Sequence, residues 1–201
     1  MNNAIYDYVS RETIPAYENY IELIKKWNRK TGLVQQHTLA TIWERHILDC
    51  IQIIPYLGNK SNSILDIGTG GGFPGILLSI AGFENIDLCE SNIRKTVFLE
   101  EAIRHLNLSA KVINNRVENI NNKYDIIVSR ACASLDQLLC YMLNVSHETS
   151  STGVFLKGKT AALEIEEAQK KWDFNFELFP SITSENSKII IVKNLKNKGD
   201  R

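Results

Sequence analysis

The stretch Ser63-Ile-Leu-Asp-Ile-Gly-Thr-Gly-Gly-Gly-Phe-Pro-Gly-Ile-Leu-Leu-Ser79 has the pattern of a buried strand, a glycine loop and a helix start in direct succession. Ile64, Leu65 and Ile67 are apolar enough for a central strand. The glycines that follow have no Cβ, so they allow positive φ angles and the close approach of a ligand. Pro74 suits a first helical turn, where its missing N–H is no loss. Such a loop offers free backbone N–H groups at the strand end, so the stretch predicts a ligand site.

Two classes of cofactor fit this loop. The run from Gly70 to Gly75 satisfies the G-x-G-x-x-G pattern of dinucleotide-binding proteins, and Glu90 follows at about the 20-residue distance expected for an acid that binds a ribose. Asp66, however, would face the two negative charges of a pyrophosphate. S-adenosylmethionine carries a sulfonium, an ammonium and no phosphate, so an acid beside the loop favours it, and Glu90 can still accept from both ribose hydroxyls. We therefore expect S-adenosylmethionine, with an NAD-dependent oxidoreductase as the alternative.

The composition is that of an ordinary soluble protein. The chain has 201 residues, of which 44% are hydrophobic and 23% charged, and its formal net charge is zero. The N-terminus lacks the features of a signal peptide, and no run of about 18 apolar residues could span a bilayer. We expect a cytoplasmic monomer with one catalytic domain and no membrane contact. Zero net charge does not by itself indicate a nucleic-acid partner, so any RNA contact must come from local patches.

The four cysteines, Cys50, Cys89, Cys132 and Cys140, lie far apart in the sequence. No C-x-x-C pair is present, so the pattern indicates neither a zinc site nor a disulfide framework. Cys132 could act as the nucleophile of a pyrimidine-C5 methyltransferase, but a thiolate needs an activating partner and the sequence shows none. We expect reduced thiols and no metal.

Residues 1–58 are expected to form an N-terminal helical extension, because they lack the glycines that punctuate the rest of the chain. In residues 17–27, apolar side chains recur at spacings of three and four, which predicts an amphipathic helix. A second helix is expected from Thr38 or Thr41, either of which could be its N-cap. The apolar stripe of that helix comprises Trp43, Ile47, Ile51 and Ile54. Residues 59–201 then form the S-adenosylmethionine-binding domain, as one compact unit.

Two features of the extension are candidates for substrate contact. Arg29 belongs to a basic cluster that ends the first helix, and such a cluster could bind RNA, although favourable charge at a helix C-terminus also explains it. His46 lies on neighbouring turns with a cation and an acid, Arg45 and Asp49. A structural hydrogen bond in a helix interface is the alternative reading of His46.

From residue 63 onward, strand patterns alternate with helical patterns, which is typical of a doubly wound α/β sheet. The expected strands are 64–67, 86–90, 110–114, 124–129, 153–157, 174–179 and 188–193. The last two are separated by residues 180–187 with no helix between them, so they should pair as an antiparallel hairpin. Seven strands that end in such a hairpin predict the Rossmann-like class I S-adenosylmethionine-dependent methyltransferase fold, with a mostly parallel sheet.

Seven segments together carry a family resemblance. They are Asp66-Ile-Gly-Thr-Gly-Gly-Gly-Phe-Pro-Gly75, Glu90-Ser-Asn-Ile-Arg-Lys-Thr-Val-Phe-Leu99, Arg116-Val-Glu118, Ser129-Arg-Ala-Cys-Ala-Ser-Leu135, Lys26-Trp-Asn28, Arg45-His-Ile-Leu-Asp49 and Leu156-Lys-Gly158. With these in place, the chain resembles the bacterial small-subunit ribosomal RNA guanine-N7 methyltransferases, a family also called glucose-inhibited division protein B. The resemblance runs nearly end to end, so it is far more specific than the glycine loop alone.

This resemblance implies transfer of the methyl group of S-adenosylmethionine to N7 of a guanine in 16S ribosomal RNA. The partner would be small-subunit ribosomal RNA within the subunit or an assembly intermediate. The implied cofactor contacts are Gly68, Phe73 beside the methionine portion, Val117 and Glu118 near the adenine, and Arg130 after the fourth strand. They add to Asp66, Gly70 and Glu90, which the loop itself indicates.

Guanine N7 has an exposed lone pair and no proton to lose, so we expect no catalytic residue that acts as a general base. The task of the enzyme is then alignment of the nucleophile with the methyl group. The segment 129–131 lacks the polar acceptors that enzymes acting on adenine N6 use. Lys157 lies at the carboxyl end of a strand, where such sheets place ligands, so it is a candidate substrate contact, with a surface or structural charge as the alternative.

An RNA-assembly factor that keeps the loop but transfers no methyl group is the competing function. Every residue assigned to the cofactor lies at or after Asp66, so we expect the extension to be needed for RNA but not for the cofactor. The lysine-rich tail, residues 193–201, is expected to be a solubilising and partly disordered end that could also meet RNA.

Overall fold

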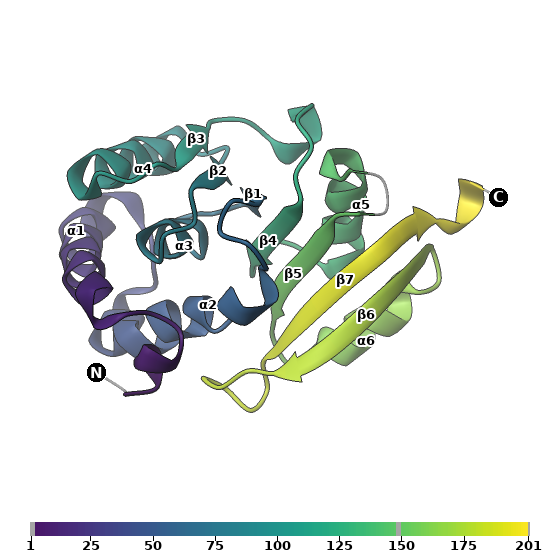
Figure 1. The fold of residues 1–201 in the computed structure, drawn as a ribbon, viewed down its shortest axis with the longest axis horizontal. Coiled ribbons are helices and arrows are strands. Elements are labelled where there is room, and N and C mark those ends of the chain that lie inside the picture. The colour runs from purple at the N-terminus through teal and green to yellow at the C-terminus, as the bar shows by residue number, and fades with distance from the viewer. Residues whose placement is uncertain (1–2, 148–149, 201) are drawn as a thin grey trace.

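The computed structural model describes residues 3–147 and 150–200, and its centre is a sheet of seven strands (Figure 1). The strands are β1 (Ser63–Ile67), β2 (Asn85–Cys89), β3 (Lys111–Ile113), β4 (Ile126–Arg130), β5 (Thr152–Lys157), β6 (Trp172–Pro180) and β7 (Lys188–Asn197). Their order is β3-β2-β1-β4-β5-β7-β6. The first five pair in parallel, and β7 runs antiparallel to both β5 and β6. The predicted fold with its C-terminal hairpin is confirmed.

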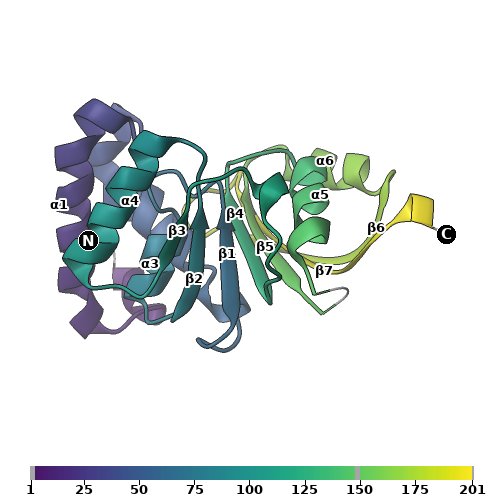
Figure 2. The same ribbon diagram turned by 90° about the horizontal axis from the view of Figure 1, so that it is seen from above.

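Helices cover both faces of the sheet, and Figure 2 shows them as two separate groups. One group holds α1 (Ile14–Thr31), α3 (Gly75–Ile80) and α4 (Ile93–Leu106), and the other holds α5 (Leu135–Val145) and α6 (Ala161–Ala168). Successive strand residues divide between them: Ile64 packs in the core with the first group and Leu65 in the core with the second. The strand order reverses between β1 and β4, so the loops at their carboxyl ends diverge and leave a crevice.

After α1, the extension is less regular than the sequence predicts. One helix is replaced by a 3-10 turn (Gln36–Thr41), a π-helical segment (Trp43–Leu48), α2 (Asp49–Ile51) and a second 3-10 turn (Ile54–Tyr56). Neither Thr38 nor Thr41 caps a helix, and the Thr38 hydroxyl donates instead to the Gln35 carbonyl oxygen at 2.7 Å. The prediction of a regular helix is wrong because an apolar spacing of four fits a wide turn as well as an α turn. Such π segments are frequent at functional sites.

The extension and the sheet domain share one hydrophobic core. Tyr17 and Tyr20 of α1 have no exposed surface and pack in the same cluster as α3 and α4. The Tyr17 hydroxyl donates to the carbonyl oxygen of Leu77 at 3.0 Å, and the Tyr20 hydroxyl donates to that of Gly71 in the glycine loop. The domain boundary after residue 58 stays a prediction, and packing is continuous across it.

Two segments near the C-terminus differ from the expectation. Helix α6 lies between β5 and β6, in a stretch for which the sequence analysis names no particular helix, and its buried Ala161, Ile165 and Ala168 repeat at helical spacing. Strand β7 continues to Asn197, and a 3-10 turn (Lys198–Asp200) follows it. Strand β7 therefore takes in much of the expected tail, where Leu195 among the lysines is only 4% exposed. Met1, Asn2 and Arg201 lie outside the described residues.

Candidate cofactor and substrate site

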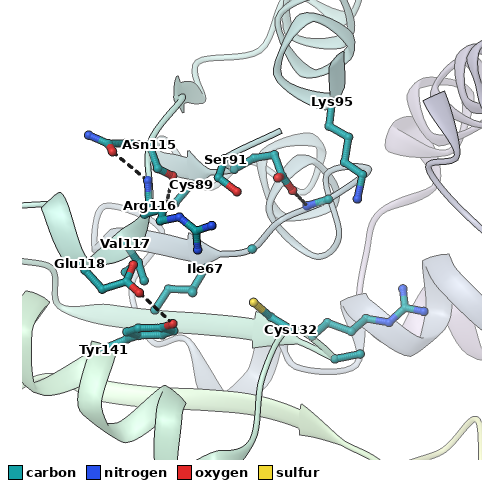
Figure 3. Close-up of a pocket in the computed structure, with 15 residues that line it drawn as sticks. Ile67, Cys89, Ser91, Lys95, Asn115, Arg116, Val117, Glu118, Cys132 and Tyr141 are labelled. Carbon is teal, nitrogen blue, oxygen red and sulfur yellow. Dashed lines mark hydrogen bonds between the residues drawn. The ribbon is translucent and has the colours of Figure 1, made fainter. Parts of the chain in front are cut away.

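A cavity of about 330 Å³ opens at the carboxyl ends of β1, β2 and β4 (Figure 3). The glycine loop after β1, the turn of residues 115–118 after β3 and residues 130–132 after β4 form its walls together with the end of β2. This is the crevice in which doubly wound sheets bind ligands. It brings together six of the eight predicted cofactor residues, Gly68, Gly70, Glu90, Val117, Glu118 and Arg130.

The glycine loop presents bare backbone to this cavity. Gly68 has a φ of 65°, and a Cβ on it would lie 2.2 Å from Sγ of Cys132, so no side chain fits there. A Cβ on Gly70 would meet only the Gly68 carbonyl oxygen, at 3.8 Å. Space above the loop is thus left for a ligand that approaches its backbone closely.

Two backbone N–H groups hold the Glu90 carboxylate at the wall of the cavity. One carboxylate oxygen accepts a hydrogen bond from the Gly70 N–H at 3.1 Å and the other from the Asn92 N–H at 2.8 Å. The side chain is 9% exposed and lines the cavity. Each oxygen keeps a lone pair, so the carboxylate can accept from two ribose hydroxyls without changing its rotamer. The arrangement fits the predicted role.

The opposite wall comes from the 3-10 turn Val117–Asn119. Val117 is 5% exposed and offers an apolar surface, while Glu118 accepts a hydrogen bond from the Tyr141 hydroxyl at 3.1 Å. Figure 3 shows Glu118 and Tyr141 closing this end of the cavity together. An apolar side chain beside a held acid suits a flat base with exocyclic N–H donors, as adenine has.

Asp66 lies behind the loop rather than in the cavity. It is fully buried, and one of its oxygens accepts from the Gly75 N–H at 2.8 Å and from the Thr69 hydroxyl. Its other oxygen has no hydrogen-bond partner among the described residues. Burial raises the pKa of Asp66 to about 7. The sequence analysis expects this acid to face the cofactor, but the structure turns it toward the start of α3, where backbone N–H groups need acceptors.

A second cavity of about 250 Å³ adjoins the first on the side of the extension. It shares Gly68, Gly70, Lys95, Arg130 and Ala131 with the first cavity, and its other walls include Leu33 and Val34 of the extension. Phe73 lies here, with its ring centroid 5.2 Å from that of His46 and 5.9 Å from that of Tyr20. The extension therefore supplies a wall beside the glycine loop, whereas the sequence analysis expects it to contact RNA but not the cofactor.

Arg130 ties the end of β4 to the extension. Its Nε forms an ion pair with the Asp49 carboxylate at 3.1 Å, and its Nη2 donates to the Arg45 carbonyl oxygen at 3.1 Å. The remaining contacts are Nη2 to Nδ1 of His46 at 3.0 Å and Nη1 to Sγ of Cys50 at 3.4 Å. The guanidinium also lies 5.5 Å from the centre of the Phe73 ring. Most of its N–H donors are thus engaged within the protein, although the side chain lines both cavities.

The partners of His46 fix its tautomer. Arginine can only donate, so Nδ1 of His46 accepts from Arg130 and carries no proton. Its Nε2 must then hold the proton and donate to the Thr38 hydroxyl oxygen at 2.7 Å. Burial, and then the charge of Arg130, lower the pKa of His46 to about 4. Both ring nitrogens of this neutral imidazole are occupied, so His46 positions Arg130 and has no free lone pair for a base.

Two other candidate substrate residues lie outside both cavities. The Lys157 ammonium forms an ion pair with Glu164 at 2.6 Å and donates to the Ala133 carbonyl oxygen at 2.7 Å, and Lys157 is 8% exposed. Arg29 is exposed on the last turn of α1. The internal partners of Lys157 favour the structural alternative for that residue, whereas the surface position of Arg29 is compatible with either reading.

Cys132 lines the first cavity, but its environment opposes a thiolate. Burial, and then the nearby Asp66 and Glu90 carboxylates, raise the pKa of its thiol. A nucleophilic cysteine needs the opposite shift. The covalent mechanism considered from the sequence is therefore not supported here.

Sequence reasoning missed several wall residues, among them Lys95, Asn115 and Tyr141. The position of Asn115 directly after β3 could have identified it, because strand ends meet at one edge of the sheet. No local signal marks Tyr141, which reaches the cavity from the middle of α5.

Within residues 3–147 and 150–200, no group of three or more His, Cys, Asp or Glu side chains could hold a metal ion, and no helix is long and apolar enough to cross a bilayer.

Residues 13–190 match the family model of GidB, described as rRNA small subunit methyltransferase G. This chain belongs to that family. A protein of Rickettsia prowazekii named Ribosomal RNA small subunit methyltransferase G is 40% identical over 187 residues, which is 93% of this chain and 97% of the relative. A protein of the same name from Rickettsia massiliae is 41% identical over 93% of this chain and 96% of its own length. The predictions of an rRNA methyltransferase and of S-adenosylmethionine as its cofactor are confirmed.

Solved methyltransferases share the fold of this GidB chain. Magnesium protoporphyrin IX methyltransferase from Synechocystis PCC 6803, with bound SAM, superposes with a TM-score of 0.63 over 87% of this chain and 97% of that one, at 11% identity. A SAM dependent methyltransferase from Aquifex aeolicus gives 0.59 over 76% and 92%, at 15% identity. At these identities the likeness supports the class I fold alone.

Proposed function

We propose that this chain transfers the methyl group of S-adenosylmethionine to N7 of a guanine in small-subunit ribosomal RNA, without a side chain that acts as a base. The observation that carries the proposal is the state of His46, the one imidazole in the walls of the two cavities, whose nitrogens are both engaged. A nucleophile that had to lose a proton would need a free acceptor at this place, and guanine N7 needs none. The cofactor supplies an electrophilic methyl group on a sulfonium.

The residues of the first cavity bind the adenosine part in this proposal. Glu90 accepts from the ribose hydroxyls, Val117 and Glu118 hold the adenine, and the backbone of Gly68 and Gly70 leaves room beside the loop. Asp66 acts indirectly, by holding the loop through the Gly75 N–H.

The second cavity takes the methionine part and the approach of the guanine. Phe73 provides its apolar floor, and Arg130 and His46 keep the wall in place. Held side chains of this kind align the two reacting groups, which is the main requirement of a methyl transfer.

We also propose that the protein is a cytoplasmic monomer. Its substrate is then the RNA within the ribosomal subunit or an assembly intermediate. Arg29 and its neighbours on α1 are the surface candidates for a phosphate contact, and their exposure supports this role. His46 and Lys157 are weaker candidates for RNA contact, because partners within the protein already occupy their polar atoms.

Radioactive methyl transfer to small-subunit RNA from a strain that lacks the gene tests the proposal. Label in a single guanine, located by mapping the modified nucleotide and its N7, is the expected result. Intact S-adenosylmethionine binding with no transfer to naked RNA, to assembly intermediates or to mature subunits would favour the RNA-assembly factor. Label on an exocyclic amino group would overturn the mechanism without a base.

A further inference from the structure

Lys95 lies where the two cavities meet. It belongs to the first turn of α4 and lines both the larger and the smaller cavity. Figure 3 shows its side chain descending from α4 toward the glycine loop. The residue is half-buried, and its ammonium has no hydrogen-bond or ion-pair partner among residues 3–147 and 150–200. A cation that lines a cavity and has no partner within the protein is available to an anionic group of a ligand.

The other cations of the walls are placed differently. Arg130 already contacts Asp49, His46 and two further groups of the extension. Arg116 is exposed and lines the first cavity alone, beside Val117 and Glu118. Lys95 is therefore the cation among the described wall residues that is both unpaired and in reach of either cavity.

We propose that the Lys95 ammonium binds the carboxylate at the methionine end of the cofactor and so selects for an amino-acid tail. This inference rests on the proposed function, because Glu90, Val117 and Glu118 place the adenosine in the first cavity. The tail then passes Gly68 and Gly70 toward the second cavity, where Lys95 lies at the junction. That carboxylate is the only anionic group of S-adenosylmethionine. Glu90 and Glu118 are acids and would repel it from the first cavity, which leaves the Lys95 ammonium as its partner.

The test compares S-adenosylmethionine with decarboxylated S-adenosylmethionine, which keeps the sulfonium and the amine but lacks the carboxylate. Affinities are measured by calorimetry on the full-length protein and on Lys95→Met, which keeps most of the apolar stem. We expect Lys95→Met to weaken S-adenosylmethionine by about 10- to 100-fold, the usual range for lost hydrogen bonds between charged groups, and to change the decarboxylated ligand less than about twofold.

Arg94→Met is the matched control, because Arg94 is exposed on the same helical turn and lines neither cavity. It should leave both affinities unchanged, and Lys95→Arg should retain the preference for the carboxylate. An equal loss of both ligands in Lys95→Met would overturn the proposal and make Lys95 a structural residue. Unchanged cofactor affinity with weaker RNA binding would also overturn it and assign Lys95 to a phosphate.

The same experiment separates this inference from the proposed function. Wild-type protein that prefers the carboxylate ligand through Lys95 but transfers no methyl group would keep the inference and contradict the transfer. Wild-type protein that binds neither ligand would overturn both.

Discussion

The two walls of the site are built in different ways. The wall of Glu90, Val117 and Glu118 comes from the residue directly after β2 and from the 3-10 turn that follows β3, and two backbone N–H groups hold the Glu90 carboxylate. The wall on the side of the extension depends on side chains that meet across long stretches of sequence, such as Arg130 with Asp49. A local wall depends on short stretches of sequence, such as the spacing that places Glu90 after the glycine loop, whereas a wall assembled at long range depends on the packing of the whole molecule.

The largest effect should follow from removing the extension. A chain that starts at Asn59 loses Tyr17, Tyr20 and Ile47, all with no exposed surface, and uncovers α3 and α4. Burial of one such side chain contributes about 1.5–3 kcal/mol, so the loss exceeds the usual stability of a domain. We expect no cooperative thermal unfolding and no binding of S-adenosylhomocysteine by the truncated chain. A folded fragment with unchanged affinity would restore the expectation from sequence that the extension serves RNA alone.

The local wall is tested by Glu90→Ala. The substitution removes acceptors for two ribose hydroxyls, so S-adenosylmethionine binding should weaken by about 1.5–3 kcal/mol. The fold should survive, because the freed N–H groups of Gly70 and Asn92 lie at the cavity and can meet water. Glu100→Ala is a control, since Glu100 is exposed on α4 and lines neither cavity. Calorimetric affinity equal to wild type would remove Glu90 from the ribose role.

The long-range wall is tested by Asp49→Asn. The side chains of Arg130 and Asp49 are 18% and 19% exposed, so their pair is partly shielded from water, and its loss should destabilise the protein by about 1–2 kcal/mol in urea unfolding. The matched control is Glu167→Gln, which breaks an exposed pair with Lys170 and should change stability by less than about 0.5 kcal/mol. Equal effects of the two substitutions would show that the Arg130 contact adds nothing to the wall.

The sequence was sufficient for the fold class with its C-terminal hairpin and for much of the local wall. Glycines and acids at strand ends carry their geometry in a short spacing, so Gly70 and Glu90 meet as expected. Gly68, Val117 and Glu118 join them as the family resemblance implies. It was insufficient for Asp66 and the extension. The side chain of a strand residue points to one face or the other, and only the packing of α3 decides that Asp66 turns away from the cavity. Likewise, apolar spacing does not distinguish the π-helical segment that brings His46 to Arg130.

The pH dependence of stability should separate two buried groups with opposite signs. The pKa of His46 falls from 6.5 to about 4, so between these values the unfolded chain binds the extra proton and stability falls as pH falls. The pKa of Asp66 rises from 3.8 to about 7, so in that window the native chain binds the proton and stability rises as pH falls.

Urea unfolding at pH 7.5 and 5.5 checks both signs. Compared with wild type, His46→Gln should lose less stability on acidification, and Asp66→Asn should lose more. Gln keeps an acceptor for Arg130, and Asn keeps an oxygen for the Gly75 N–H, so both variants preserve the main contacts. Equal changes in stability for all three proteins would show that folding shifts the pKa of neither group.

The smallest expected effect concerns the chemical step itself. The N7 lone pair is free of protons between about pH 6 and 9, so the single-turnover rate at saturating RNA and cofactor should change by less than about twofold across that range. His46 cannot impose a titration there, because its pKa lies near 4 and Arg130 and Thr38 occupy both ring nitrogens. His46→Gln keeps an acceptor for Arg130, so its single-turnover rate should stay close to that of wild type and its pH profile should be as flat. A steep rise with an apparent pKa near 6.5 that disappears in His46→Gln would contradict the mechanism without a base. His46 would then act as a general base, and the nucleophile would have to be a group that loses a proton.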